Sequence, residues 1–154
     1  MQFRGRKKSK QADAKQVFDY ACWLLARRVY SQAELLKKFN TRFIPDTEIF
    51  AAVLKKLEKL GLQSDEDFTE SFVRSHPGWG SYRLKLELSK RGISEEMIEL
   101  FLPQDQAELS RCQEALQKKL KDSKVPEEYA ERQKLAAFLA RRGFSLEVIK
   151  EVLK

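Results

Sequence analysis

Apolar residues recur at every third or fourth position through most of this chain, with polar and charged residues between them. Near the start, Val17, Ala21 and Leu24 share one face of a helix that we expect over residues 14–29. No stretch shows the strict apolar–polar alternation that is typical of a half-buried β-strand. Only 6 glycines and 4 prolines occur in 154 residues, which fits long helices. The pattern predicts an all-α protein.

One apolar pattern occurs twice: the segment 91–102 returns as the segment 142–153. Each copy starts with Arg-Gly, places one apolar residue at the bend, caps the next helix with serine and continues as an apolar stripe. A weaker copy occupies residues 42–49, and Val53 and Leu54 extend its stripe. Repetition at this spacing indicates a row of small helical modules, a shape suited to binding along an extended partner.

Local start and stop signals divide the chain into three repeats of three helices. Ser31-Gln32-Ala33-Glu34 is a capping box that starts the second helix, and Gly61 ends the third. We expect a basic disordered tail over 1–13, repeat 1 over 14–63, repeat 2 over 64–104 and repeat 3 over 105–154.

Two later helices are expected over residues 78–92 and 127–142, where apolar residues again recur at helical spacing. The stripes of the successive helices also predict which side chains lie against the core. Those expected to be inward-facing or in the apolar stripe include Leu36, Leu60, Met97, Phe101 and Leu102. Val29 is expected beside the inward face of its helix, and Leu86 and Tyr129 are apolar members of the later helices.

Charge is spread unevenly along the chain. The formal net charge is +7, and residues 1–15 contribute +5 of it, leaving +2 for the rest. A tail with so few apolar residues is expected to be disordered in isolation. It is either an arm attracted to nucleic acid phosphates or an acidic protein surface, or a solvated tail that aids solubility.

The apolar runs are too short for a secretion signal or a membrane span, since the longest one near the N-terminus is Ala21–Ala26. Cys22 and Cys112 lie far apart within helical patterns, without metal-ligand spacing. Packed thiols in a reducing cytoplasm are the interpretation we favour.

The inventory of reactive groups argues against an enzyme. His76 is the single histidine and lies in a Ser-His-Pro sequence typical of a helix end, so no two-histidine metal site can form. Glycine-rich phosphate loops are absent, and the carboxylates lie beside lysines and arginines or in first turns. We therefore expect neither catalysis nor a cofactor or metal.

What remains is a set of basic and aromatic residues that suits an interface. Aromatic rings beside guanidinium groups occur at protein interfaces and on nucleic acid. Two structural interpretations stay open: Trp79 and Tyr82 as core residues, which we favour for these aromatics alone, and cations that stabilise helix C-termini by about 0.3–1 kcal/mol each. The candidate contact residues are Arg27, Arg28, Tyr30, Lys37, Lys38, Trp79, Tyr82, Arg83, Lys90, Arg91, Arg141 and Arg142.

An ordered series of motifs from about residue 17 onward resembles one family, the bacterial RecX regulatory proteins. The motifs are Ser31-x-x-Glu34-Leu35 with Lys38-Phe39, Gly61-Leu62-x-x-Asp65-x-x-Phe68, Phe72-Val73-x-Ser75, and Gly78-Trp79-Gly80-x-x-Arg83-Leu84-x-x-Glu87-Leu88-x-x-Arg91-Gly92-Ile93. The last run is the most specific. The chain departs from the pattern at Gln63, His76-Pro77 and Ser81.

The resemblance implies three tandem three-helix repeats in an elongated, curved molecule. It also implies a partner, the RecA recombinase polymerised on single-stranded DNA, with the protein bound along the filament groove. The expected effect is inhibition of ATP hydrolysis, strand exchange and the coprotease activity behind the SOS response, and hence regulation of recombination and DNA repair. We expect a cytoplasmic monomer with weak, non-specific DNA binding.

Two other classes stay open from the residues themselves. The first is a helical-repeat DNA-binding protein, although no helix carries the several base-reading side chains expected in a major groove. The second is a scaffold that pairs with another helical protein.

Overall fold

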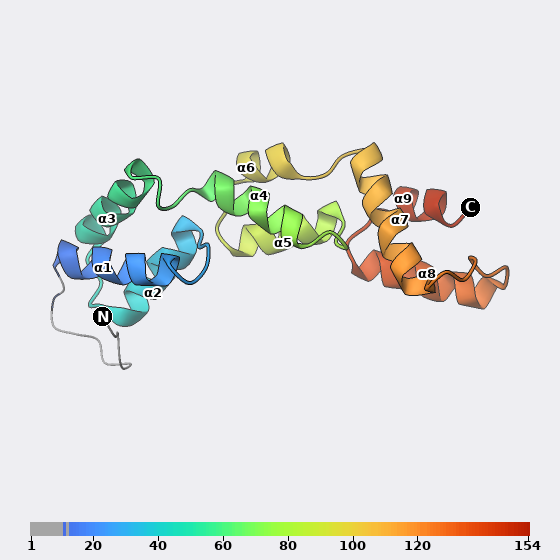
Figure 1. Cartoon of the computed structure of the whole chain (residues 1–154), viewed down its shortest axis with the longest axis horizontal. Helices are drawn as coiled ribbons and strands as arrows, with labels where there is room; N and C mark the ends of the chain where they lie inside the picture. Colours follow the sequence, from blue (N-terminus) through green and yellow to red (C-terminus); the bar gives the residue numbers. More distant parts are fainter. Residues whose placement is uncertain (1–10, 12) are drawn as a thin grey trace. The chain divides into compact units, whose positions relative to one another are not determined.

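The computed structural model describes residue 11 and residues 13–154. Within these residues it contains nine α-helices and no β-strand (Figure 1), which confirms the predicted all-α class. The basic residues of the predicted tail before residue 11 lie outside the described part. The helices are α1 (Ala14–Leu25), α2 (Gln32–Arg42), α3 (Thr47–Lys59), α4 (Asp65–Ser75), α5 (Ser81–Lys90), α6 (Glu95–Phe101), α7 (Gln106–Leu120), α8 (Tyr129–Arg141) and α9 (Leu146–Val152).

Two compact units make up the structure. Unit 1 contains the chain up to Phe68 together with Arg91–Ile93, and unit 2 contains Thr69–Lys90 together with Ser94–Lys154. Helix α4 therefore contributes its first residues to unit 1 and the remainder to unit 2. The helices form consecutive triplets, but the exact boundaries of the three repeats stay a prediction.

Polar side chains start most helices, as the sequence indicated. Ser31 and Glu34 form the predicted capping box: the Ser31 Oγ accepts from the Glu34 N–H at 3.1 Å, and a Glu34 carboxylate oxygen accepts from the Ser31 N–H at 3.1 Å. Ser94 and Ser145 accept from the N–H groups of Met97 and Val148 in the same way. Asp13 is the N-cap of α1, so the predicted tail can extend no further than residue 12.

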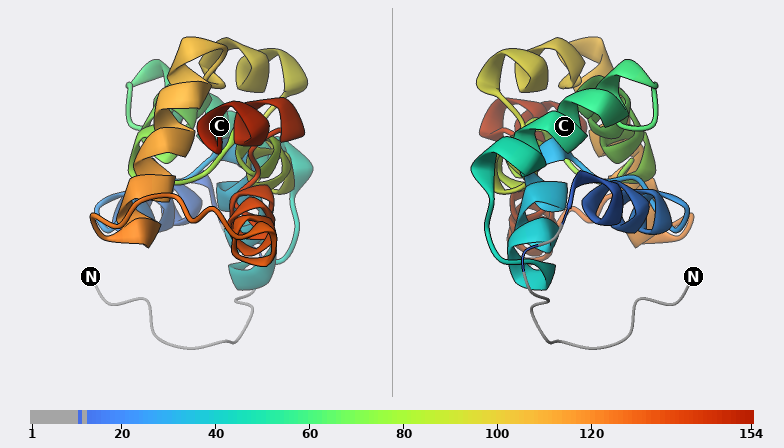
Figure 2. Two further views of the ribbon diagram at one scale, coloured as in Figure 1. Left: turned by 90° about the vertical axis from the view of Figure 1, so that its right-hand side faces the viewer. Right: turned by 90° about the vertical axis from the view of Figure 1, so that its left-hand side faces the viewer.

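The core of unit 1 lies between α1, α2 and α3 (Figures 1 and 2). Aromatic side chains fill much of it: the rings of Tyr20 and Phe43 meet edge to face with centroids 5.6 Å apart, and those of Phe39 and Phe50 lie 5.4 Å apart. Val17, Leu35 and Leu57 are fully buried among them. Burial of these side chains, worth roughly 1.5–3 kcal/mol each, holds three short helices together.

The core of unit 2 is built mainly from α7, α8 and α9, with α9 packed against both other helices (Figure 2). Its centre contains Cys112, Leu116, Leu139 and Ile149, all at most 4% exposed. Helix α5 packs on α6 and adds buried leucines at positions 84 and 88. Each unit therefore has apolar interior of its own.

Helix ends and partly exposed stripes account for the errors in the sequence prediction. Helix α1 ends at Leu25, not at Val29, because Arg27 and Arg28 have no buried face to occupy and the chain turns at Ala26. Helix α5 starts at Ser81 and ends at Lys90, and α8 starts at Tyr129, both inside the predicted ranges. Wrongly expected to be buried were Leu36, Leu60 and Tyr82, which are exposed, and Met97, Phe101 and Leu102, which are half-buried. Val29, Leu86 and Tyr129 are exposed as well.

The repeated Arg-Gly turns dock on the N-terminus of an earlier helix, once in each unit. In unit 1 the carbonyl of Arg91 accepts from the Ser31 Oγ at 2.7 Å, and a Cβ added at Gly92 would lie 2.3 Å from the Cβ of Ala33. In unit 2 the carbonyls of Arg142 and Gly143 accept from the N–H groups of Gly80 and Tyr82 at 2.8 and 3.1 Å.

Glycine is required at both turns for two reasons. The backbone of Gly92 and Gly143 is left-handed, with φ of +78° and +93°. A Cβ at Gly143 would also lie 2.4 Å from the backbone nitrogen of Arg83. A carboxylate from the helix two further along the chain completes each junction: Asp65 accepts from the Gln32 N–H at 2.8 Å, and Glu108 accepts from the Ser81 N–H at 3.2 Å. The repeat in the sequence therefore corresponds to one repeated contact.

Candidate interaction surface

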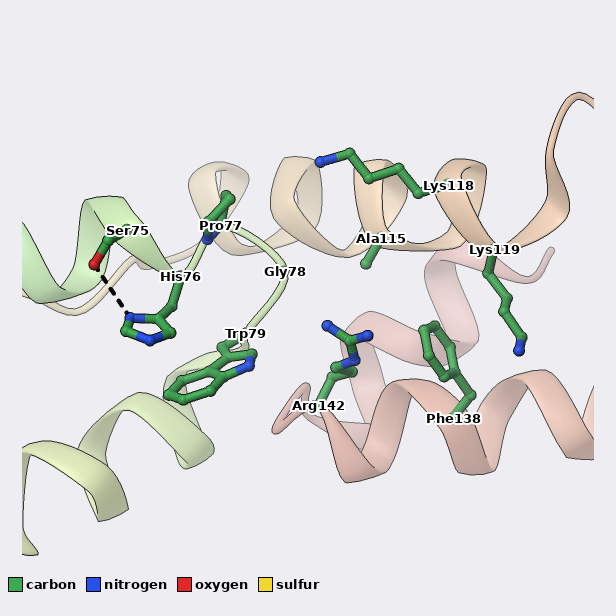
Figure 3. A pocket seen from close by; sticks show the side chains of 10 residues that line it. All are labelled: Ser75, His76, Pro77, Gly78, Trp79, Ala115, Lys118, Lys119, Phe138 and Arg142. Carbon is green, nitrogen blue, oxygen red and sulfur yellow. Dashed lines mark hydrogen bonds between the residues drawn. The ribbon is translucent and has the colours of Figure 1, made fainter.

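A basic groove in unit 2 is the most distinctive surface feature of the described chain (Figure 3). It encloses about 490 Å³ between the turn after α4, the C-terminal half of α7 and the C-terminal part of α8. No acidic residue lines it. The lining consists of Ser75, His76, Pro77, Gly78, Trp79, Ala115, Lys118, Lys119, Phe138 and Arg142.

Arg111 of α7 holds the turn that forms one wall of this groove. Its guanidinium donates to the carbonyls of His76, Trp79 at 3.2 Å and Val73 at 3.3 Å. Val73 lies in the last turn of α4, and His76 and Trp79 follow its end, where carbonyls lack the full set of helical N–H partners. Burial lowers the pKa of the Arg111 guanidinium. The nearby carboxylates of Glu114 and Glu108 raise this pKa and so offset part of the decrease.

A stack of side chains fixes Trp79 beside the turn. The ring of His76 lies 4.0 Å from the Trp79 ring centre and 4.3 Å from that of Phe72, and the His76 Nδ1 lies 2.7 Å from the Phe72 carbonyl. The Arg83 guanidinium lies 3.9 Å from the Trp79 ring centre. His76 and Arg83 therefore both cover the Trp79 ring.

Arg142 joins this wall to α8. Its backbone carbonyl accepts from Gly80, while its guanidinium lies 5.0 Å from the ring centre of Phe138 and closely against Gly78. Lys119 approaches the same Phe138 ring, at 5.1 Å. Among the predicted contact residues, the structure thus brings Trp79, Arg83 and Arg142 together.

Several of the predicted contact residues belong to unit 1. The guanidinium of Arg27 lies 3.6 Å from the ring centre of Trp23, and that of Arg28 lies 3.8 Å from the ring centre of Tyr30. Tyr30 is only 7% exposed, and its ring supports Arg28. Lys37 and Lys38 are exposed on α2.

Arg28 and Arg91 share one carboxylate, that of Glu34, at 3.6 and 3.8 Å. Elsewhere, Lys90 is exposed and pairs with Glu87 at 3.4 Å. Tyr82, which we favoured as a core residue, is 69% exposed.

Tyr82 lines a different hollow from Trp79, with Glu99, Asp105 and Glu108 nearby. Arg141 is exposed at the end of α8. Within unit 2, the candidates therefore do not form one continuous site.

Sequence reasoning missed Lys118, Lys119 and Arg111. The two lysines end a helix as a basic pair, like the pairs that were selected, so this signal was present in the sequence. The role of Arg111 depends on contacts with residues more than thirty positions away, and no local pattern indicates it.

Other reactive groups do not form a site in the part of the chain that the structure describes. Burial raises the pKa of the Cys112 thiol to about 11, and burial, with Asp19 nearby, also raises the pKa of Cys22. No group of three or more potential metal ligands occurs in the described residues. None of the helices within residues 13–154 is long and apolar enough to cross a membrane.

Comparison with known proteins places these features in a family. The model of the second three-helix domain of RecX matches residues 64–102, and that of the third matches residues 106–153. A "Regulatory protein RecX" from Chlorobium phaeobacteroides (strain BS1) is 39% identical over 145 residues, covering 92% of this chain and 93% of the relative. A "Regulatory protein RecX" from Legionella pneumophila (strain Corby) is 36% identical over 140 residues, covering 89% of this chain and 92% of the relative.

A solved structure supports the same fold. The crystal structure of RecX from Lactobacillus salivarius matches with a TM-score of 0.78 at 23% identity, covering 92% of this chain and 94% of that one. The fold and its surface define an all-helical protein of repeated three-helix domains. The chain belongs to the RecX family of regulatory proteins, as its motifs indicated.

Proposed function

We propose that this protein is a negative regulator of the RecA recombinase. It binds along the groove of the RecA filament on single-stranded DNA and inhibits ATP hydrolysis, strand exchange and coprotease activity. The observation that carries the proposal is the similarity to proteins named regulatory protein RecX over 92% of the chain. Such a protein acts in the cytoplasm, as a monomer and without catalysis.

Several separate contact surfaces make this mode of action physically reasonable. Both units carry exposed cations, such as Lys37 and Lys38 in unit 1 and Arg141 in unit 2. Surfaces joined in one chain raise each other's effective concentration at a polymer, so individually weak contacts combine. A protein that binds an inactive filament state more tightly than the active one shifts the filament population toward inactivity.

The decisive measurement is RecA ATPase activity on single-stranded DNA with substoichiometric amounts of this protein. The wild-type protein should inhibit. The double variant Arg83→Ala/Arg91→Ala should need about fivefold more protein for half-inhibition or more, since each exposed ion pair contributes up to about 1 kcal/mol. Circular dichroism checks that the variant is folded.

A matched control removes one cation from each unit outside the candidate set. Lys55 and Lys150 are exposed and belong to units 1 and 2. Lys55→Ala/Lys150→Ala should inhibit as the wild type does. An unchanged ATPase rate with the wild-type protein, together with sequence-specific binding to duplex DNA, would instead establish the helical-repeat DNA-binding class.

A further inference from the structure

We propose that the basic groove of unit 2, formed by Trp79, Lys118, Lys119, Phe138 and Arg142, binds a short acidic peptide segment of a protein partner. This inference rests on the proposed function in one respect, namely that the partner is a protein. The groove lies entirely within unit 2, so its geometry is that of one compact body.

The first argument is that the cations at the groove lack a neutralising carboxylate. No acidic side chain lines the groove, and within the described residues no ion pair involves Arg83 or Arg142. The equivalent junction in unit 1 differs, because there Glu34 accepts Arg91 at 3.8 Å. The helix position that corresponds to Glu34 is taken by Arg83 in unit 2.

This substitution removes the carboxylate that pairs with the turn arginine in unit 1 and puts a second cation at the junction. Two cations without a carboxylate partner favour an anion that binds beside them. In unit 1 the carboxylate of Glu34 neutralises the cation at this junction. In unit 2 the cations at the equivalent junction have no such carboxylate, so an anion from a partner can neutralise them.

The second argument is that the cationic groups are already held in place. The Arg142 guanidinium lies against Gly78 and near Phe138, and Lys119 lies near the same ring. Arg111 fixes the turn after α4, which forms one wall, through three carbonyls. Ordering a long basic side chain on binding costs about 0.5–1.5 kcal/mol, and a prearranged side chain avoids part of that cost. An arginine fork also matches a carboxylate in bidentate geometry.

The third argument favours a peptide over single-stranded nucleic acid. Proteins that bind unpaired bases offer open aromatic faces for stacking. Here the Trp79 ring is covered by His76 and Arg83, and Phe138 supports Lys119 and Arg142.

The charge of the whole unit agrees with this choice. Unit 2 contains 15 lysines and arginines against 14 aspartates and glutamates, a net charge of +1. A long polyanion would gain little attraction outside the groove. A peptide with a few consecutive carboxylates matches the positive charge of unit 2, because that charge is confined to the groove.

Fluorescence of Trp79 provides a direct test. In a Trp23→Phe variant of the full chain, Trp79 is the remaining tryptophan. We would titrate this protein with an acetylated, amidated peptide of alternating Asp and Glu, which has no fluorescence of its own, and with the neutral Asn/Gln peptide as control. The acidic peptide should change the Trp79 emission saturably, and the neutral peptide should not.

Charge-removing variants in the same background locate the binding. Lys118→Ala/Lys119→Ala should weaken binding of the acidic peptide by about tenfold, the effect of roughly 1.4 kcal/mol. Lys124→Ala/Lys150→Ala removes two exposed cations of the same unit outside the groove and should change binding by less than about twofold. Arg142→Gln should also weaken binding, with the fold checked by circular dichroism.

Three results would overturn the proposal: no binding of the acidic peptide, equal losses in the two lysine pairs, or groove-dependent binding of oligothymidylate in place of the peptide. RecA ATPase inhibition by the wild-type protein separates this proposal from the proposed function. Retained inhibition without peptide binding defeats the groove proposal alone. Peptide binding without inhibition leaves the groove site standing and defeats the proposed function.

Discussion

At the scale of single residues, two glycines with similar backbone geometry have very different surroundings. Gly61 and Gly143 both have left-handed backbones, with φ of +70° and +93°. A Cβ at Gly61 would meet no atom within 4 Å, whereas a Cβ at Gly143 would lie 2.4 Å from the backbone nitrogen of Arg83. The first glycine is needed for its conformation alone, the second also for space.

Alanine substitutions should separate these two requirements. Gly61→Ala should lower the free energy of unfolding by about 1 kcal/mol, the penalty for a left-handed alanine. Gly143→Ala should lower it by roughly 2–5 kcal/mol, because overpacking against Arg83 adds to that penalty. Urea unfolding followed by Trp23 emission for unit 1 and Trp79 emission for unit 2 measures both. Equal decreases in the free energy of unfolding would show that the residues around Gly143 shift to accommodate a methyl group at little energetic cost.

Cys112 predicts a dependence of stability on alkaline pH. Burial raises the pKa of its thiol from 9.0 to about 11 in the folded protein, so the folded state favours the neutral thiol. This stabilisation is complete below pH 9 and is lost as pH rises through about 11. Between pH 8 and 10.5 the loss should be roughly 2 kcal/mol.

Urea unfolding of unit 2 at the two pH values, compared with Cys112→Ala, isolates this contribution from other titrating groups. The wild type should lose more stability than the variant over this range. Parallel losses in both proteins would mean that the Cys112 thiol ionises as it does in the unfolded chain.

At the scale of helices, local signals predicted the starts better than the ends. Serine caps act on N–H groups within three residues of themselves, so Ser31, Ser94 and Ser145 could be recognised from the sequence. The end of α1 and the exposure of Leu60 and Tyr129 could not. The end of a helix and the exposure of its side chains depend on how far the neighbouring helices pack along it, and no local sequence pattern specifies this packing.

Two of these caps should differ in energetic weight. The Ser31 Oγ both caps α2 and donates to the Arg91 carbonyl, and it is fully buried, whereas the Ser94 Oγ caps α6 from an exposed position. Ser31→Ala should therefore destabilise unit 1 by about 2–3 kcal/mol, and Ser94→Ala should destabilise unit 2 by about 1 kcal/mol.

Chemical denaturation with the tryptophan of each unit as the probe tests this difference. If Ser31→Ala were no worse than Ser94→Ala, the hydrogen bond to Arg91 would contribute nothing measurable to the junction.

At the scale of the whole molecule, the sequence predicted the helical class and the family but only part of the candidate surface. Basic pairs at helix ends were visible, yet the grouping of Trp79, Arg83 and Arg142 arises because the Gly143 turn docks on α5. The contribution of Arg111 depends on the same tertiary arrangement. Likewise, the burial of Tyr30 follows from its position in the core of unit 1.

The N-terminal basic segment gives a prediction at this scale. Because Asp13 caps α1, the deletion should remove residues 1–12 and keep Asp13. Thermal unfolding should be unchanged, and affinity for single-stranded DNA should fall with a smaller salt dependence, since fewer phosphate contacts release fewer counterions. Differential scanning calorimetry and fluorescence anisotropy measure the two. A lower unfolding temperature would show that the segment packs on the folded chain.

The Arg-Gly turns dock through their main-chain carbonyls, which accept hydrogen bonds in both units, and this has a consequence for protein engineering. A connector that recognises backbone geometry accepts different side chains on its outer face, as the change from Glu34 to Arg83 illustrates. Designers could therefore transplant the joint to append further domains while choosing the exposed chemistry of each one independently.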